Sequence, residues 1–161
     1  MNYRQALKAA RAACAEINLQ RNVTLQSIQH DIELSRRRPI VIAEIPGMSG
    51  QDVCGLWLQT AGEELIVHAK VRSELHRQQI ILHEFSHMIL HHDLQGPDTD
   101  YAADLLPGLD SRLVLRALGR SSYGSQAEFR AEVLADHLAN AIVHSSADQL
   151  TEPLAFGEVF G

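Results

Sequence analysis

The chain has 161 residues, a length sufficient for one domain with its own hydrophobic core. Of these residues 45% are hydrophobic and 21% charged, a composition typical of a globular protein. Its formal net charge of −6 disfavours direct binding to the phosphate backbone of nucleic acids. No signal peptide, no bilayer-spanning apolar run and no disulfide framework is evident in the sequence, so we expect a cytoplasmic protein with no membrane contact.

The first half of the chain is predicted to form two helices followed by a small sheet. Apolar residues at helical spacing predict a helix over 2–16, and an N-cap threonine predicts a second helix over 24–38 that ends before Pro39. The run Arg36-Arg37-Arg38 is then expected to be a solvated helix end. Three short apolar, partly β-branched segments predict strands at 39–45, 53–60 and 64–69. The short link at Ala61-Gly62 predicts a hairpin between the last two strands.

The second half of the chain is dominated by two predicted helices. Ser73 is an N-cap residue for a long helix that reaches about Asp93, and Ser125 caps a final helix that ends near His144. Between them, a turn-rich stretch precedes a short predicted helix over 110–118. Together the elements predict a single α+β domain over 1–161, made of N-terminal helices (1–38), a small three-stranded sheet (39–70), a long helix (73–93) and a final helix (125–144).

The predicted 73–93 helix contains a candidate metal-binding and catalytic motif, His83-Glu84-Phe85-Ser86-His87. His83 and His87 are four residues apart, so their imidazoles lie on one face of the helix and can bind one Zn²⁺ from the same side. Glu84 lies about 100° further round the helix and can reach a water on the metal as a general base. This is the H-E-x-x-H arrangement of metallopeptidases.

A catalytic zinc site needs a third protein ligand, which must come from another element. Four residues of the final helix have suitable side chains: Glu128, Glu132, Asp136 and His137. Helical geometry alone allows Glu128, Glu132 or Asp136, which share one face. We predict Glu132, because the small residues Ala135 and Ala139 beside it permit close approach of the two helices. Asp136, one turn further on, is then placed to accept the N–H of a metal-bound histidine.

Two further histidines follow the motif. His91 continues the row of His83 and His87, but it lies two turns from His83, more than about 10 Å along the helix axis. One zinc ion cannot bond to both ends of that row. We therefore expect His91 to pack beside the site or to support a ligand, and His92 to face solvent or the edge of the core.

Taken in order, these segments resemble the ImmA/IrrE family of zinc metallo-endopeptidases. The family pattern is a strand hairpin that leads into H-E-L-G-H-x-x-L-H, and the matching segments here are Gly55 to Leu58, Glu64 to His68 and Arg77 to His91. The second block of the family, E-x-x-A-N in many members, is similar to the stretch from Ala131 to Asp136. It is preceded by Arg120 to Tyr123, which also match. The resemblance covers more than half of the chain.

The sequence departs from the family pattern at three places. Ser86 stands where the family has glycine, and Asp136 stands where asparagine is common. The L-L-M-P ending of the family is absent after Ala139. None of the three departures removes a histidine or the glutamate of the H-E-x-x-H motif.

The resemblance implies a zincin-like core with one Zn²⁺ held by His83, His87 and Glu132, and with Glu84 as the catalytic base. Tyr123 is a candidate hydrogen-bond donor to the oxyanion, with an ordinary packed tyrosine as the alternative. Residue types alone leave the native metal open among Zn²⁺, Mn²⁺ and Fe²⁺.

The resemblance also implies a protein substrate. Family members typically cleave or inactivate a helix-turn-helix transcriptional repressor or an antitoxin-like partner, so we expect site-specific hydrolysis of such a regulator. The alternative is a regulatory or toxin-like binding partner of a helix-turn-helix protein that keeps the zinc fold with little hydrolytic activity. Glu84 favours the enzyme, because a binding module has no need of a base beside its metal.

Overall fold

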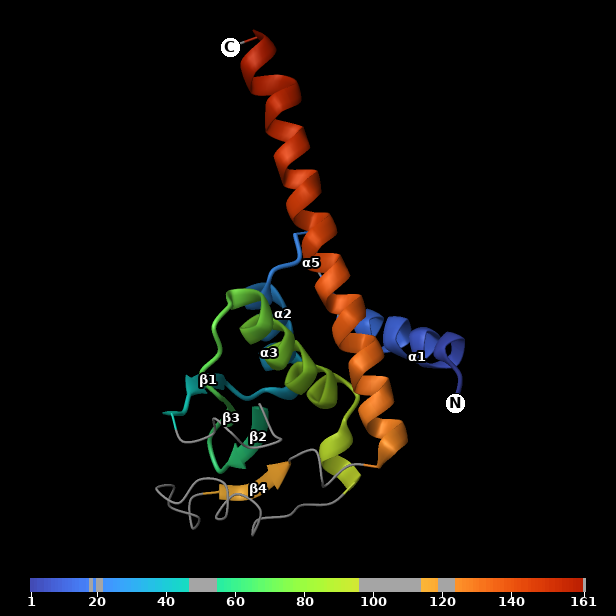
Figure 1. Ribbon diagram of the computed structural model, residues 1–161, viewed down its shortest axis with the longest axis vertical. Helices are drawn as coiled ribbons and strands as arrows, with labels where there is room; N and C mark the ends of the chain where they lie inside the picture. The colour runs from blue at the N-terminus through green and yellow to red at the C-terminus, as the bar shows by residue number, and fades with distance from the viewer. Residues whose placement is uncertain (18, 20–21, 47–54, 96–113, 119–123, 161) are drawn as a thin grey trace.

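The computed structural model describes residues 1–161 except 18, 20–21, 47–54, 96–113, 119–123 and 161. The described part has an α+β architecture in which helices pack on one side of a small sheet (Figure 1). The helices are α1 (Tyr3–Glu16), α2 (Leu25–Arg36), α3 (Glu74–Ile89) and α5 (Ser125–Phe160), with a short 3-10 helix η2 (His92–Gln95). The strands are β1 (Ile40–Glu44), β2 (Gly55–Thr60), β3 (Glu64–His68) and β4 (Val114–Leu118).

The sheet is mixed, with the strand order β1-β3-β2-β4. The predicted hairpin is confirmed: β2 and β3 pair antiparallel from Gly55 opposite His68 to Gln59 opposite Glu64. Strand β1 pairs parallel with β3 on the other side. The three strands expected from the sequence are therefore present, and positions 53 and 54 of the second expected strand lie outside the described residues.

Strand β4 extends this sheet and corrects one prediction. We expected a short helix over 110–118, but Val114–Leu118 is a strand that pairs antiparallel with β2. Leucine, arginine and alanine are among the strongest helix formers, but helix propensity is overridden where tertiary context favours a strand. Here that context is β2, whose open edge offers unpaired N–H and C=O groups to a further strand.

The core lies between the sheet and the helices. Trp57 of β2 and Ile66 of β3 are fully buried on the face that packs against α3 and α2. On the helical side, Phe85 and Met88 of α3 join the same cluster, as does Leu134 of α5. Helix α3 therefore has one apolar side towards the sheet and another side towards α5.

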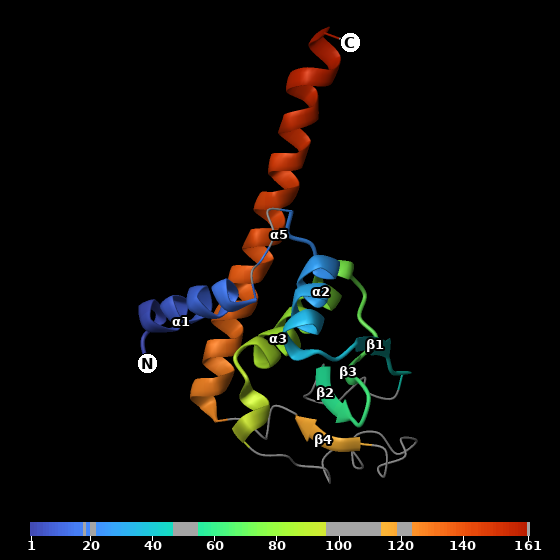
Figure 2. The same cartoon turned by 180° about the vertical axis from the view of Figure 1, so that it is seen from behind.

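Helix α5 is much longer than the sequence indicated. We expected it to end near His144, but it continues to Phe160. Figures 1 and 2 show that its C-terminal half extends beyond the other elements, while its N-terminal half packs against α1 and α3. The sequence after Ser145 lacks the amphipathic period of a packed helix, and for that reason it was not recognised as helical.

Helix α3 begins where the sequence predicted and ends earlier. Ser73 is the N-cap, and its hydroxyl accepts a hydrogen bond from the backbone N–H of His76 at 3.1 Å. The helix stops at Ile89, not near Asp93. His91, just after the helix, has a φ of 54°, a left-handed conformation common at helix C-termini, and η2 begins at the next residue.

A buried ionic network connects α2 to the sheet and to η2. Arg36 donates to Glu64 Oε1 at 2.8 Å and to Asp93 Oδ2 at 2.8 Å, and its guanidinium carbon lies 4.9 Å from the centre of the Trp57 ring. Trp57 Nε1 donates to the second oxygen of the fully buried Glu64. Arg36 is thus the largely buried partner of two carboxylates, and the expectation that it belongs to a solvated helix end is wrong. Arg37 beside it is exposed.

Candidate metal centre

Helices α3 and α5 pack against each other and bring three candidate ligands together. His83 and His87 lie one turn apart on the side of α3 that faces α5, as the helical period predicted. Glu128 lies in the first turn of α5. Its neighbours Ala127 and Ala131 are small and buried, which allows the two helices to come close at this point.

The ligand atoms of these three side chains converge on one small volume. The two Nε2 atoms of His83 and His87 lie 3.1 Å apart, and the ring centroids lie 4.8 Å apart in an edge-on arrangement. Glu128 places Oε2 3.2 Å from His83 Nε2 and Oε1 3.3 Å from His87 Nε2. Two ligand atoms bound to one tetrahedral ion at about 2.1 Å are separated by about 3.4 Å. The group can therefore hold a metal ion with little rearrangement.

The charge state of Glu128 suits this role. Burial raises the pKa of its carboxyl group, but the hydrogen bonds and charges of His83 and His87 outweigh that effect and lower the pKa to about 2. Glu128 is consequently ionised at neutral pH. A carboxylate between two imidazoles offers the one negative and two neutral donors that a divalent cation binds in many protein sites.

His92 lies on the other side of the His87 ring. Its Nδ1 is 2.7 Å from His87 Nδ1, the ring centroids are 5.0 Å apart, and the side chain is buried. Burial and the neighbouring His87 lower the pKa of His92 to about 4. His91, by contrast, is exposed. The expectation that His91 packs beside the site is thus wrong, whereas His92 is buried, one of the two positions expected for it, and contacts His87.

Glu84 is buried and points towards the start of β2. A Cβ atom added to Gly55 would lie 3.0 Å from Glu84 Oε1 and 2.7 Å from Ile80 Cγ2. The carboxylate of Glu84 therefore lies directly over Gly55, where the absence of a side chain leaves room for it. Its side chain leaves α3 about 100° away from that of His83, so it borders the ligand cluster without belonging to it.

The prediction that Glu132 is the third ligand is wrong. Glu132 is exposed, and Glu128, one turn earlier, faces the two imidazoles. The spacing E-x-x-A occurs from Glu128 to Ala131 and again one turn later, from Glu132 to Ala135. We assigned the second occurrence to the family block, and the first occurrence is the one that lies at the site.

The expected role of Asp136 is also corrected. Asp136 is exposed and accepts a hydrogen bond from Gln79 Nε2 at 3.2 Å, so it does not orient a histidine of the cluster. Gln79 lies one turn before His83 on α3. His87 is instead contacted on its Nδ1 side by His92. Tyr123, the candidate oxyanion donor, lies outside the described residues.

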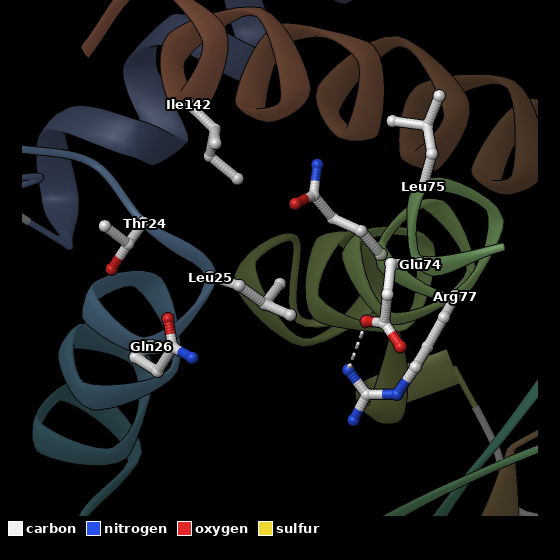
Figure 3. A pocket seen from close by; sticks show the side chains of 8 residues that line it. Thr24, Leu25, Gln26, Glu74, Leu75, Arg77 and Ile142 are labelled. Atoms are coloured by element: carbon white, nitrogen blue, oxygen red, sulfur yellow. Dashed lines mark ion pairs between the residues drawn. The ribbon is translucent and has the colours of Figure 1, made fainter. Parts of the chain in front are cut away.

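A separate surface cleft lies at the other end of α3. Its volume is about 370 Å³. Figure 3 shows its lining, which comes from the first turns of α2 and α3 and from α5: Thr24, Leu25, Gln26, Glu74, Leu75, Arg77, Gln78 and Ile142. These lining residues include none of the three candidate metal ligands. The cleft is therefore distinct from the metal centre.

Comparisons of the chain with protein-family models, curated proteins and solved structures found no match. The geometry of the metal centre and the residues around it are therefore the basis for a functional proposal. Among the described helices, none combines the length and the hydrophobicity that crossing a membrane requires.

Proposed function

We propose that this protein is a zinc-dependent endopeptidase with His83, His87 and Glu128 as metal ligands and Glu84 as the catalytic base. The observation that carries the proposal is the convergence of three ligand atoms from α3 and α5 beside the glutamate of the H-E-x-x-H motif. Hydrolytic zinc sites use three protein ligands and keep a further position open. Two imidazoles and one carboxylate form such a set.

The protein residues around the centre have distinct parts in this proposal. Zinc, when bound, supplies Lewis-acid activation of a water molecule and of the substrate carbonyl. Glu84 accepts the proton of the attacking water and delivers it to the amine of the leaving peptide. Gly55 leaves the space that the Glu84 carboxylate occupies. Burial of Glu84 strengthens its electrostatic interactions with the reacting groups.

The family assignment and the zincin-like core are part of the same proposal. Support comes from the order of the elements: the β2–β3 hairpin, the H-E-x-x-H helix α3 against the sheet, and the third ligand on a later helix. The resemblance of the sequence to the ImmA/IrrE family follows the same order, with Glu128 in place of Glu132. On this basis the substrate is a helix-turn-helix transcriptional regulator. The net charge of −6 also favours a protein over a nucleic acid as the direct substrate.

The experiment that tests this proposal combines metal content with proteolysis. The purified wild-type protein is expected to contain about one zinc per chain, and His83→Ala and His87→Ala are each expected to lower that content sharply. Incubation with a helix-turn-helix regulator is expected to give discrete fragments that a chelator prevents. Absence of zinc from the wild-type protein after zinc loading would overturn the proposal.

The same experiment distinguishes catalysis from binding alone. Glu84→Gln keeps all three ligands and removes the base, so it is expected to bind zinc and the regulator without cutting the regulator. Equal cleavage by wild type and Glu84→Gln would exclude Glu84 as the base. A wild-type protein that binds zinc and the regulator without cleavage would support a regulatory binding partner instead of an enzyme.

A further inference from the structure

We propose that His92 is a positioning residue of the metal centre, which accepts the Nδ1–H of His87 and so directs the lone pair of His87 Nε2 towards the metal. The inference rests on the proposed metal site. The sequence alone did not indicate it, because His92 follows the end of α3 and is not part of the row of histidines along the helix. Its place is set by the turn that ends α3.

The turn at the end of α3 brings the two rings together. Leu90 closes the helix, and His91 takes a left-handed conformation with a φ of 54°. The next residue, His92, is the first of η2. His92 is 2% exposed and meets the His87 ring at the nitrogen that points away from Glu128.

The contact between the two rings determines where the protons lie. The Nδ1 atoms of His87 and His92 are 2.7 Å apart, a separation at which one nitrogen donates a proton and the other accepts it. A neutral His87 that binds a metal through Nε2 carries its proton on Nδ1. His92 Nδ1 must then be the acceptor, which fixes the tautomer and the ring orientation of His87.

His92 does not belong to the ligand set itself. The ligand atoms that lie within 4.8 Å of one another come from His83, His87 and Glu128. The ring of His87 lies between Glu128 and His92, because its Nε2 faces Glu128 and its Nδ1 faces His92. Metal-binding histidines usually donate this second N–H to a carboxylate, a carbonyl or water. Here a buried imidazole takes that place.

The buried ionic network holds η2 in position. Asp93, next to His92, accepts hydrogen bonds from Arg36 at 2.8 Å and from Gln59 at 3.2 Å. Arg36 also donates to the backbone carbonyl of Met88, next to His87, at 3.3 Å. The residues that follow both histidines are thus tied to one guanidinium group. This common attachment limits the motion of one ring relative to the other.

The test uses three variants and two measurements. His92→Phe keeps a planar ring without an acceptor, His92→Asn places an amide oxygen close to the position of Nδ1, and His91→Asn is the matched control at the exposed neighbour. Asparagine tolerates the left-handed conformation of His91. Zinc affinity is measured by competition with a chromophoric chelator. The tautomer of His87 is measured by ¹⁵N NMR of the zinc-loaded protein.

The expected result is a 10–100-fold loss of zinc affinity in His92→Phe, the usual effect of losing such a contact. His92→Asn is expected to recover most of the affinity, and His91→Asn to equal the wild type. In the wild-type protein, His87 Nδ1 is expected to carry a proton protected from exchange, with ¹⁵N–¹⁵N coupling to His92 across the hydrogen bond. This coupling is measured without any variant, so it applies even if His92→Phe fails to fold.

The outcomes separate this inference from the proposed function. Failure of the wild-type protein to bind zinc would overturn the proposed function and the positioning role together. Zinc binding by the wild type without coupling between the two rings would overturn the positioning role alone. Wild-type zinc affinity in a folded His92→Phe variant would do the same.

Discussion

Glu128 at the start of α5 lies opposite His83 in the second half of α3, with a carboxylate oxygen 3.2 Å from Nε2. Two turns further along α5, Asp136 is hydrogen-bonded to Gln79, one turn before His83 on α3. The two helices therefore run antiparallel. Their register selects which of the acidic residues on α5 meets the two imidazoles.

This register predicts different effects for two neighbouring glutamates. Glu128→Ala is expected to remove most of the bound zinc, as His87→Ala does, because it deletes one of three protein ligands. Glu132→Ala, the same change one turn away at an exposed position, is expected to leave zinc content unchanged. Elemental analysis of both variants after zinc loading and gel filtration makes the comparison. If Glu132→Ala lost its zinc and Glu128→Ala kept it, the proposed ligand set would be wrong.

Glu84→Gln is predicted to separate metal binding from catalysis. The substitution keeps the size of the side chain that lies over Gly55, so the fold and the zinc content are expected to stay as in the wild type. The cleavage rate is expected to fall by about 10²–10⁴-fold, the usual contribution of a general base. Zinc content and cleavage are measured on the same preparation. A large loss of zinc would mean that Glu84 supports the ligands as well.

Gly55 is predicted to be intolerant of any side chain. In Gly55→Ala the new methyl group meets Ile80 Cγ2 at 2.7 Å and Glu84 Oε1 at 3.0 Å, so one or both side chains must move. We expect a loss of about 1–3 kcal/mol of stability and a larger loss of cleavage than of zinc affinity. Gly62→Ala is the control, because a Cβ at Gly62 meets no atom within 4 Å. Equal melting temperatures for the two variants would contradict this account.

Arg36→Met is predicted to destabilise the fold strongly. It leaves the buried carboxylates of Glu64 and Asp93 without their shared cation, a change that costs about 3–5 kcal/mol in comparable buried pairs. Arg37→Met, the same change at the exposed neighbour, is expected to alter the free energy of unfolding by less than about 0.5 kcal/mol. Chemical denaturation of both variants provides the measurement. Similar free energies of unfolding for Arg36→Met and Arg37→Met would show that the ionic network contributes little to stability.

The same network predicts a dependence of stability on acid pH. Burial raises the pKa of Asp93, but the hydrogen bond and charge of Arg36 outweigh this effect and hold it below the ordinary value of 3.8. A carboxylate with a lowered pKa in the folded state stabilises the fold above its unfolded-state pKa, and this contribution is lost as the pH falls through the folded-state value. Asp93→Asn is therefore expected to flatten the decline in stability below about pH 4. Denaturation curves at several pH values compare it with the wild type.

The sequence by itself determined the features that depend on neighbours within one helical turn or one hairpin. His83, Glu84 and His87 could be placed relative to one another because an α-helix fixes the directions of residues one and four positions apart. The N-cap at Ser73 was also predictable, since a capping side chain bonds within its own first turn. The β2–β3 hairpin followed from a short link between two apolar segments.

Only the tertiary structure decided which residues from distant segments complete the centre. Glu128 and Glu132 have the same spacing to a following alanine, and the antiparallel register of α3 and α5 selects Glu128. His92 meets His87 across the turn at His91, whose left-handed backbone conformation is not encoded by side-chain patterns. Strand β4 likewise formed where β2 offered an open edge, against the helical preference of its own residues. In each case the deciding contact joins elements whose relative placement depends on packing of the whole core.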